Sequence, residues 1–132
     1  MTTIANTSAG TPVVKVDERW PIAAARAADD KQATDTLVLA VGDVLAITDH
    51  FVITSGANRR QVRTIAEAIE EQITLEGGPK PLHVEGLDDQ RWVLVDYGAF
   101  VVHVFLQEAR EYYELERLWS DVPRVAWAVD QS

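Results

Sequence analysis

Residues 91–105, RWVLVDYGAFVVHVF, constrain the fold more than any other part of this chain. Two runs rich in β-branched and aromatic residues flank Gly98 and Ala99, which is the pattern of two strands joined by a tight turn. Glycine at the first of two turn positions favours a type II′ turn. The residues that then face each other across the strands are Asp96 with Val101, Leu94 with His103, and Trp92 with Phe105. The segment therefore predicts an antiparallel β-hairpin in a defined register.

Alternation along this hairpin predicts two faces of different chemistry. One face is almost entirely apolar, as expected where a sheet packs against helices, and it would carry Val93, Val95, Tyr97, Phe100, Val102 and Val104. The other face would carry Trp92, Leu94, Asp96, Val101, His103 and Phe105. That mixture is too polar for an ordinary core and too apolar for a plain solvated surface. It indicates a surface that binds a partner.

The elements before the hairpin begin with a helix. The alanine-rich run at residues 21–31 has proline where a first helical turn tolerates it. Short β-rich runs at residues 36–41 and 50–54 predict two strands. The clearest helix begins at Asn58, a good N-cap with Gln61 in capping-box spacing. Its apolar stripe is Val62, Ile65, Ala66, Ile69 and Ile73.

Glycine and proline at residues 77–79 stop this helix. Residues 81–86 predict a third strand, which precedes the hairpin, and residues 108–119 predict a last amphipathic helix. That helix would place Tyr112, Leu115, Leu118 and Trp119 near one side. The resulting order, α-β-β-α-β-β-β-α, predicts an α/β domain with helices packed on a mixed β-sheet.

We expect one domain, because the chain of 132 residues is of ordinary single-domain size. Residues 1–18 lack a periodic apolar pattern and predict a flexible N-terminal tail. The domain would then span residues 19–125, followed by a C-terminal tail at residues 126–132. The tails carry none of the predicted core.

Charge and composition narrow the function. A formal net charge of −9 argues against phosphate-backbone binding as the main source of affinity, and a basic protein partner fits better. The chain has no cysteine, which excludes thiolate catalysis and thiolate metal sites. Its apolar runs are about strand length, far short of the roughly 20 residues of a membrane span, and the N-terminus has no signal-peptide pattern. These features favour a cytoplasmic protein without membrane association.

The search for catalytic groups is mostly negative. The glycines are scattered through turns and form no phosphate-binding loop. The histidines His50, His83 and His103 lie on three predicted strands without metal-ligand spacing, although residues far apart in sequence could converge. The aspartates at strand ends and turns, Asp43, Asp49 and Asp96, fit backbone capping but leave a metal-binding carboxylate pair open. No metal or cofactor is expected.

Four stretches, in order, resemble the ribosomal silencing factor family, also called Iojap-like proteins. They are ITDHFVITSG (47–56), RQVRTIAEAIEE (60–71), KPLHVEGLDDQRWVLVDYGAFVVHVF (80–105) and AREYYELERLW (109–119). The resemblance implies a nucleotidyltransferase-like fold that has lost catalysis. It also implies binding to the large ribosomal subunit through ribosomal protein L-fourteen. Bound there, such a protein would block joining of the small subunit and repress translation during starvation or stationary phase.

The partner contacts expected on this hypothesis combine the mixed hairpin face with aromatic residues nearby. They are Trp92, Leu94, Asp96, Tyr97, His103, Tyr112 and Trp119, since aromatic side chains are frequent interface anchors. Alternation equally allows Tyr97 and Trp119 to belong to the core and His103 to be a passive neighbour of Leu94. The alternative function is a small nucleotidyltransferase-like enzyme that retains nucleotide or metal binding through the aspartates or histidines. The sequence leaves monomer and homodimer open.

Overall fold

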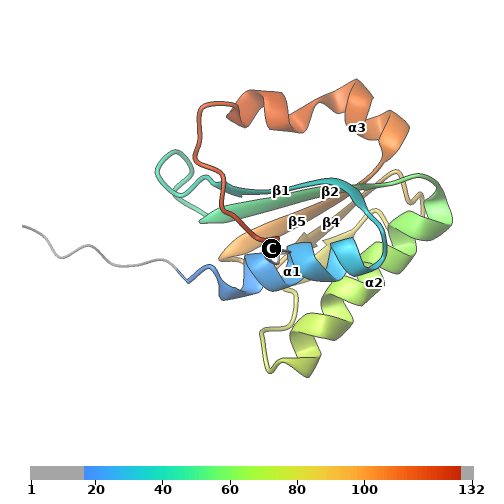
Figure 1. Cartoon of the computed structure of the whole chain (residues 1–132), viewed down its shortest axis with the longest axis horizontal. Helices are drawn as coiled ribbons and strands as arrows, with labels where there is room; N and C mark the ends of the chain where they lie inside the picture. The colour runs from blue at the N-terminus through green and yellow to red at the C-terminus, as the bar shows by residue number, and fades with distance from the viewer. Residues whose placement is uncertain (1–16, 129–132) are drawn as a thin grey trace, which may run out of the picture.

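The computed structural model describes residues 17–128, which form a five-stranded sheet between two helical layers (Figure 1). In chain order the elements are α1 (Arg19–Asp30), β1 (Thr34–Ala40), β2 (His50–Gly56), α2 (Arg59–Leu75), β3 (His83–Glu85), β4 (Trp92–Asp96), β5 (Phe100–Leu106), α3 (Gln107–Tyr113) and the 3₁₀ helix η1 (Leu115–Trp119). The predicted order of helices and strands is confirmed. The prediction for residues 1–16 lies outside the described residues.

The sheet is mixed, with strand order β1-β2-β5-β4-β3. The central strands β2 and β5 run parallel, and every other neighbouring pair is antiparallel. Both central strands are buried along most of their length, as expected for strands covered on both faces. The predicted α/β fold with a mixed sheet is therefore confirmed.

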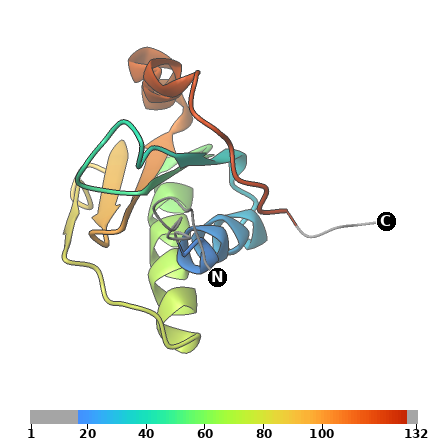
Figure 2. The same ribbon diagram turned by 90° about the vertical axis from the view of Figure 1, so that its left-hand side faces the viewer.

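Two helices cover the sheet face that carries Val93, Val95, Val102 and Val104, which we call the first face. Figure 2 shows α1 and α2 together on this side, with α3 and η1 on the other. The predicted stripe of α2 faces the sheet, because all five of its residues have 0% exposure. Small side chains let α1 approach closely, since Ala24, Ala25 and Ala28 are also fully buried. The main core lies between the first face and these helices.

Local signals in the sequence explain where α2 begins and ends. The Asn58 side chain accepts a hydrogen bond from the Gln61 amide at 2.8 Å, which is the predicted N-cap. The side-chain Oε1 of Gln61 accepts from the Ala57 amide at 2.7 Å, one residue earlier than a standard capping box. At the other end Gly77 has a φ of 82°, and the Gly78 amide reaches the Ile73 carbonyl at 2.8 Å. This is the left-handed glycine stop that the sequence predicts.

The last predicted helix is not continuous. Its α-helical part ends at Tyr113, and Glu114 adopts a left-handed conformation with φ 48° and ψ 46°. The chain resumes as η1, whose 3₁₀ geometry places residues on different sides from an α-helix. Leu118 is 77% exposed and Tyr112 78% exposed. The prediction of one continuous amphipathic helix over residues 108–119 is therefore wrong.

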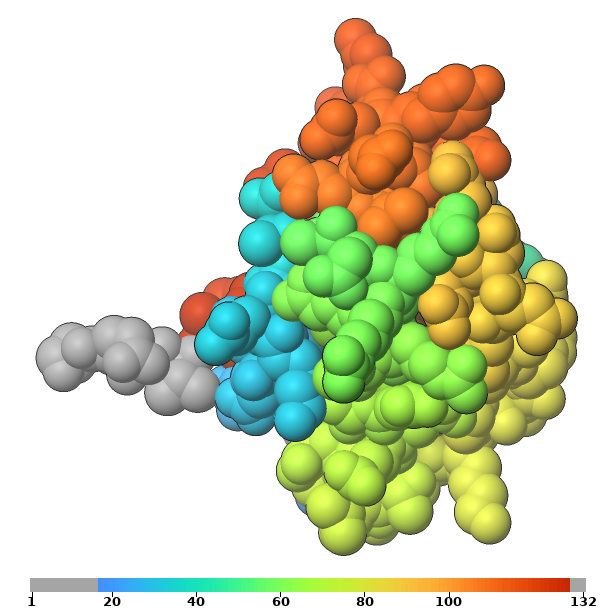
Figure 3. All heavy atoms as spheres, turned by 90° about the vertical axis from the view of Figure 1, so that its right-hand side faces the viewer, coloured from blue at the N-terminus to red at the C-terminus, as the bar shows by residue number. Residues whose placement is uncertain are grey.

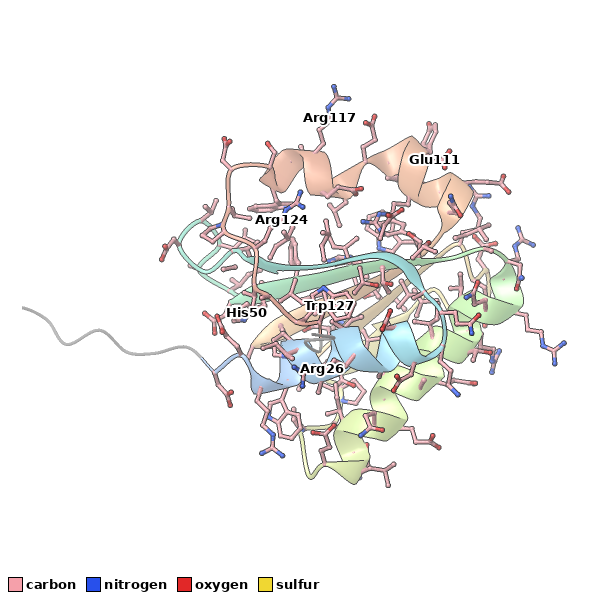
Figure 4. The ribbon with its side chains drawn as sticks, viewed as in Figure 1. Arg26, His50, Glu111, Arg117, Arg124 and Trp127 are labelled. Atoms are coloured by element: carbon pink, nitrogen blue, oxygen red, sulfur yellow. The ribbon has the colours of Figure 1, made fainter. Side chains whose placement is uncertain are left out.

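The C-terminal segment continues past the predicted boundary at residue 125. Residues 123–125 run along the outer edge of β1, where the Ala40 amide donates to the Pro123 carbonyl and the Val125 amide to the Val38 carbonyl. The Trp127 indole donates to the Thr36 carbonyl at 3.1 Å, and Arg26 on α1 donates to the Trp127 carbonyl at 2.8 Å (Figure 4). Trp127, predicted to lie in a tail, thus belongs to the folded domain. Its segment covers an edge strand that would otherwise expose unpaired backbone groups.

Candidate functional site

The hairpin of β4 and β5 forms in the predicted register. Asp96 pairs with Val101, Leu94 with His103 and Trp92 with Phe105. Gly98 has a φ of 85°, and Ala99 is not among the residues with positive φ, as a type II′ turn requires. The Asp96 carboxylate accepts a hydrogen bond from the Gly98 amide at 2.8 Å. Asp96 therefore stabilises the turn as well as lying on the mixed face.

Tyr97 lies on the first face, as alternation allowed. It is 6% exposed, and its ring stacks on Phe100 with centroids 4.5 Å apart. Burial raises the pKa of its hydroxyl, which therefore stays neutral at physiological pH. Tyr97 packs in the core beneath the turn, so its side chain presents little surface to a partner.

The opposite side of the sheet, which we call the second face, is partly covered by α3 and η1. In the space-filling view α3 forms a ridge at one end of the molecule (Figure 3). Trp92 packs against Phe105 at 4.7 Å and against Tyr113 of α3 at 5.0 Å, both between ring centroids. Its indole nitrogen donates to His103 Nδ1 at 3.1 Å. Trp92, His103 and Phe105 from the predicted contact face therefore pack beneath α3. Together with Phe51 and Tyr113 they form what we call the aromatic layer.

His103 lies inside this aromatic layer. It is 5% exposed, and its ring lies 4.8 Å from that of Phe51. Burial lowers the pKa of His103 to about 4, so the ring is neutral at physiological pH. Neutral His103 accepts from Trp92 on Nδ1 and carries its proton on Nε2, which has no hydrogen-bond partner within residues 17–128. His103 thus orients Trp92 from below instead of lying at the surface.

Trp119 and Tyr112 differ sharply in exposure. Trp119 is half-buried and packs edge-on against Phe51, with centroids 5.4 Å apart and planes at 90°. Tyr112 is 78% exposed and contacts Tyr113 on the outer side of α3. The structure therefore brings Trp119 to the sheet and leaves Tyr112 on the surface.

The part of the second face on β3, β4 and the start of β5 remains open. Leu94, Asp96 and Val101 are half-buried there, and His83 on β3 places Nε2 3.5 Å from the carboxylates of both Asp96 and Glu85. We call these five residues the open half of the second face. It combines apolar side chains with two carboxylates, which suits a partner that presents basic and apolar groups.

Sequence reasoning missed two residues of the aromatic layer, Phe51 and Tyr113. Phe51 alternates with the buried Val52 on β2, so period-two alternation was the signal that could have found it. Tyr113 had no such signal, because its position depends on the break at Glu114. The layer is therefore broader than the hairpin alone suggests.

The groups of the alternative, enzymatic hypothesis lie in two separate places. Asp43, Asp49 and His50 line one small pocket of about 190 Å³, whereas Asp96 and His103 lie on the second face. Burial lowers the pKa of His50 against the opposing effect of nearby carboxylates, and its Nε2 lies 3.9 Å from Glu18. Within residues 17–128 no three histidine, aspartate or glutamate side chains are grouped to hold a metal ion. In the same range, no helix is long and apolar enough to cross a membrane.

Comparison with known proteins places this α/β fold among ribosome-associated regulators. The profile of the family "Ribosomal silencing factor during starvation" matches residues 17–132. The ribosomal silencing factor RsfS of Bacillus subtilis is 46% identical over 100 residues, covering 76% of this chain and 84% of that protein. Mouse mitochondrial assembly of ribosomal large subunit protein 1 is 36% identical over 92 residues, covering 68% of this chain and 40% of that protein.

A solved structure from Bacillus halodurans shares the fold. It has a TM-score of 0.72 and 34% identity, and the match covers 83% of this chain and 99% of that one. The family profile spans every described helix and strand. The chain belongs to the ribosomal silencing factor family.

Proposed function

We propose that this protein binds the large ribosomal subunit through ribosomal protein L-fourteen and thereby blocks joining of the small subunit. The family it belongs to supports a role in ribosome silencing. The observation that carries the proposal is the second face, where an aromatic layer borders an open, half-buried apolar and acidic surface. Repression of translation in starvation or stationary phase would follow from blocked joining, and the protein would act in the cytoplasm.

The chemistry of the second face suits a basic protein partner. Leu94 and Trp92 offer apolar area beside the carboxylate of Asp96, and such mixed patches contain the anchors of many interfaces. The net charge of −9 favours encounter with basic ribosomal proteins. Direct binding to nucleic acid contributes little on this proposal, because a basic stripe is absent from the sequence.

The predicted contact residues take two roles in this proposal. Trp92, Leu94 and Asp96 on the hairpin, with Tyr112 and Trp119 from α3 and η1, contact the partner. Tyr97 and His103 do not contact the partner but position residues that do, because both are at least nine-tenths buried. His103 holds the indole of Trp92 through a hydrogen bond, and Tyr97 supports the turn that places Asp96.

The proposed action is steric and has no chemical step. A protein bound at the joining surface of the large subunit excludes the small subunit as long as it stays bound. The strength of inhibition therefore depends on how slowly the protein dissociates from the large subunit. For related complexes, dissociation rates account for most differences in affinity. Neither nucleotide nor metal is required on this proposal.

A subunit-joining assay tests the proposal. Purified large subunits are incubated with the protein, small subunits are added, and joined ribosomes are separated on a density gradient. We expect joining to fall in proportion to occupancy of the large subunit, and to fall much less when the protein is added after joining. Undiminished joining at saturating protein would overturn the proposal.

A further inference from the structure

The packing of η1 on the core is limited, because only Leu115 and Trp119 of its five residues contact the core. None of its five residues is fully buried. The preceding break at Glu114 removes the helical continuity that would otherwise align it with α3. Yet η1 carries Trp119, which packs on Phe51 of the sheet. A buried polar contact adds to this apolar packing and ties η1 to the second face.

Arg110 makes that contact from inside the protein. Its guanidinium Nε donates to the Glu116 carboxylate at 3.1 Å, and Nη1 donates to the Ser55 hydroxyl at 2.8 Å and lies 3.4 Å from the Thr34 carbonyl. The Arg110 side chain is 7% exposed and that of Glu116 34% exposed. One side chain of α3 thus joins η1 to both β1 and β2. By contrast, the labelled Arg117 side chain points away from the sheet (Figure 4).

The spacing of this ion pair links it to the aromatic layer. In a 3₁₀ helix, residues three apart lie one above the other, so Glu116 and Trp119 share a side of η1. On an α-helix, residues three apart are also neighbours, so Arg110 and Tyr113 share a side of α3. Tyr113 packs on Trp92 at 5.0 Å and Trp119 on Phe51 at 5.4 Å. Each member of the pair precedes, by three residues, an aromatic ring that packs on the second face.

We propose that the Arg110–Glu116 pair is a positioning device that fixes Tyr113 and Trp119 over the second face for partner binding. This inference rests on the proposed function. A largely buried ion pair usually adds little net stability, because desolvation offsets the attraction between the charges. Its geometric effect is larger, since a charge-assisted hydrogen bond is directional. The pair therefore sets the shape of the contact surface more than the stability of the fold.

The test replaces both charges and follows Trp119 directly. The variant Arg110→Met with Glu116→Leu removes the pair, together with the Arg110 bonds to Ser55 and Thr34, while keeping similar volume. Fluorotryptophan labelling gives one fluorine resonance for each of the four tryptophans, and Trp119→Phe assigns that of Trp119. In the double variant we expect the Trp119 resonance to move toward the position seen in the unfolded protein. The resonance of Trp20, on the other side of the sheet, should not move.

Large-subunit affinity is measured on the same variant and should fall at least tenfold. The matched control is Arg63→Met with Glu67→Leu, an exposed pair on α2 with the same 3.1 Å contact, which should change neither readout. Glu116→Leu alone should lower the urea midpoint more than the double variant, because it leaves the Arg110 charge buried without its counter-charge.

An unmoved Trp119 resonance in the double variant would overturn the inference, and so would a displaced Trp119 with unchanged affinity. If the unaltered protein itself fails to bind large subunits, the proposed function fails. In that case an unmoved Trp119 resonance would still refute positioning, so the two failures can be told apart.

Discussion

Neighbouring residues on β5 show how one step along a strand moves a side chain between different environments. Val102 has 0% exposure and lies on the first face, whereas Val101 is half-buried on the open half of the second face. We expect Val102→Ala to lower the free energy of unfolding by roughly 2 kcal/mol through lost burial and the cavity left behind. Val101→Ala should cost about 1 kcal/mol or less. Urea denaturation of both variants measures the difference, and equal costs would show that the assignment of faces is wrong.

His103 makes stability depend on pH. Its folded pKa of about 4 lies below the unfolded value near 6.5, so only the unfolded state binds a proton between these values. The contribution of neutral His103 is complete above about pH 6.5, falls as pH decreases toward 4, and is lost below that. Between about pH 6.5 and pH 4 the free energy of unfolding falls by about 3 kcal/mol through this residue.

Urea midpoints of the unaltered protein and of His103→Gln at pH 7.5 and pH 5 measure this contribution. The unaltered protein should lose more stability between the two pH values than the variant does. His50, whose pKa burial also lowers, is present in both proteins, so the difference isolates His103. Identical pH dependence would mean that His103 is not buried in its neutral form.

For helices and strands, the sequence predicted the features that depend on neighbouring residues, namely helix ends and turns. The cap at Asn58, the glycine stop of α2 and the turn at Gly98 each depend on neighbouring residues, and the structure confirms all three. The two faces of the hairpin followed from alternation, and the first face is core as predicted. These features depend on short-range geometry that a sequence pattern records directly.

The failed predictions all involve contacts between distant residues. Helical periodicity across residues 108–119 reflects local spacing only, whereas the buried bonds of Arg110 with Ser55 and Thr34, close to the break at Glu114, join segments far apart in sequence. For the same reason, alternation could not show that α3 would cover His103. Trp127 was assigned to a tail because its partner, the Thr36 carbonyl, lies 91 positions away.

Trp127 gives a direct test of the C-terminal segment. We expect Trp127→Ala to lower the free energy of unfolding by about 2 kcal/mol, since it removes buried aromatic area and the hydrogen bond to Thr36. Leu118→Ala, at a residue 77% exposed, is the control and should cost little. Chemical denaturation measures both. An unchanged free energy of unfolding in Trp127→Ala would show that this residue is not part of the folded domain.

At the scale of the whole molecule, net charge predicts the salt dependence of binding. A nucleic-acid binder that contacts 6–10 phosphates loses about 10³–10⁵ in affinity between 50 and 200 mM salt. Since this acidic protein would bind a ribosomal protein, we expect a loss of about tenfold or less over the same range. Sedimentation with large subunits across a salt series gives the slope. A thousandfold loss would indicate direct binding to ribosomal RNA.

Pelleting of matched variants tests whether the second face binds the large subunit. Leu94→Arg places a positive charge on the open half of the second face, whereas Leu75→Arg places the same charge at an exposed position of α2, across the sheet. The unaltered protein and Leu75→Arg should pellet with large subunits and not with small ones, and Leu94→Arg should lose at least tenfold in affinity. Equal pelleting with both subunits, or unchanged binding of Leu94→Arg, would show that the second face does not mediate specific binding to the large subunit.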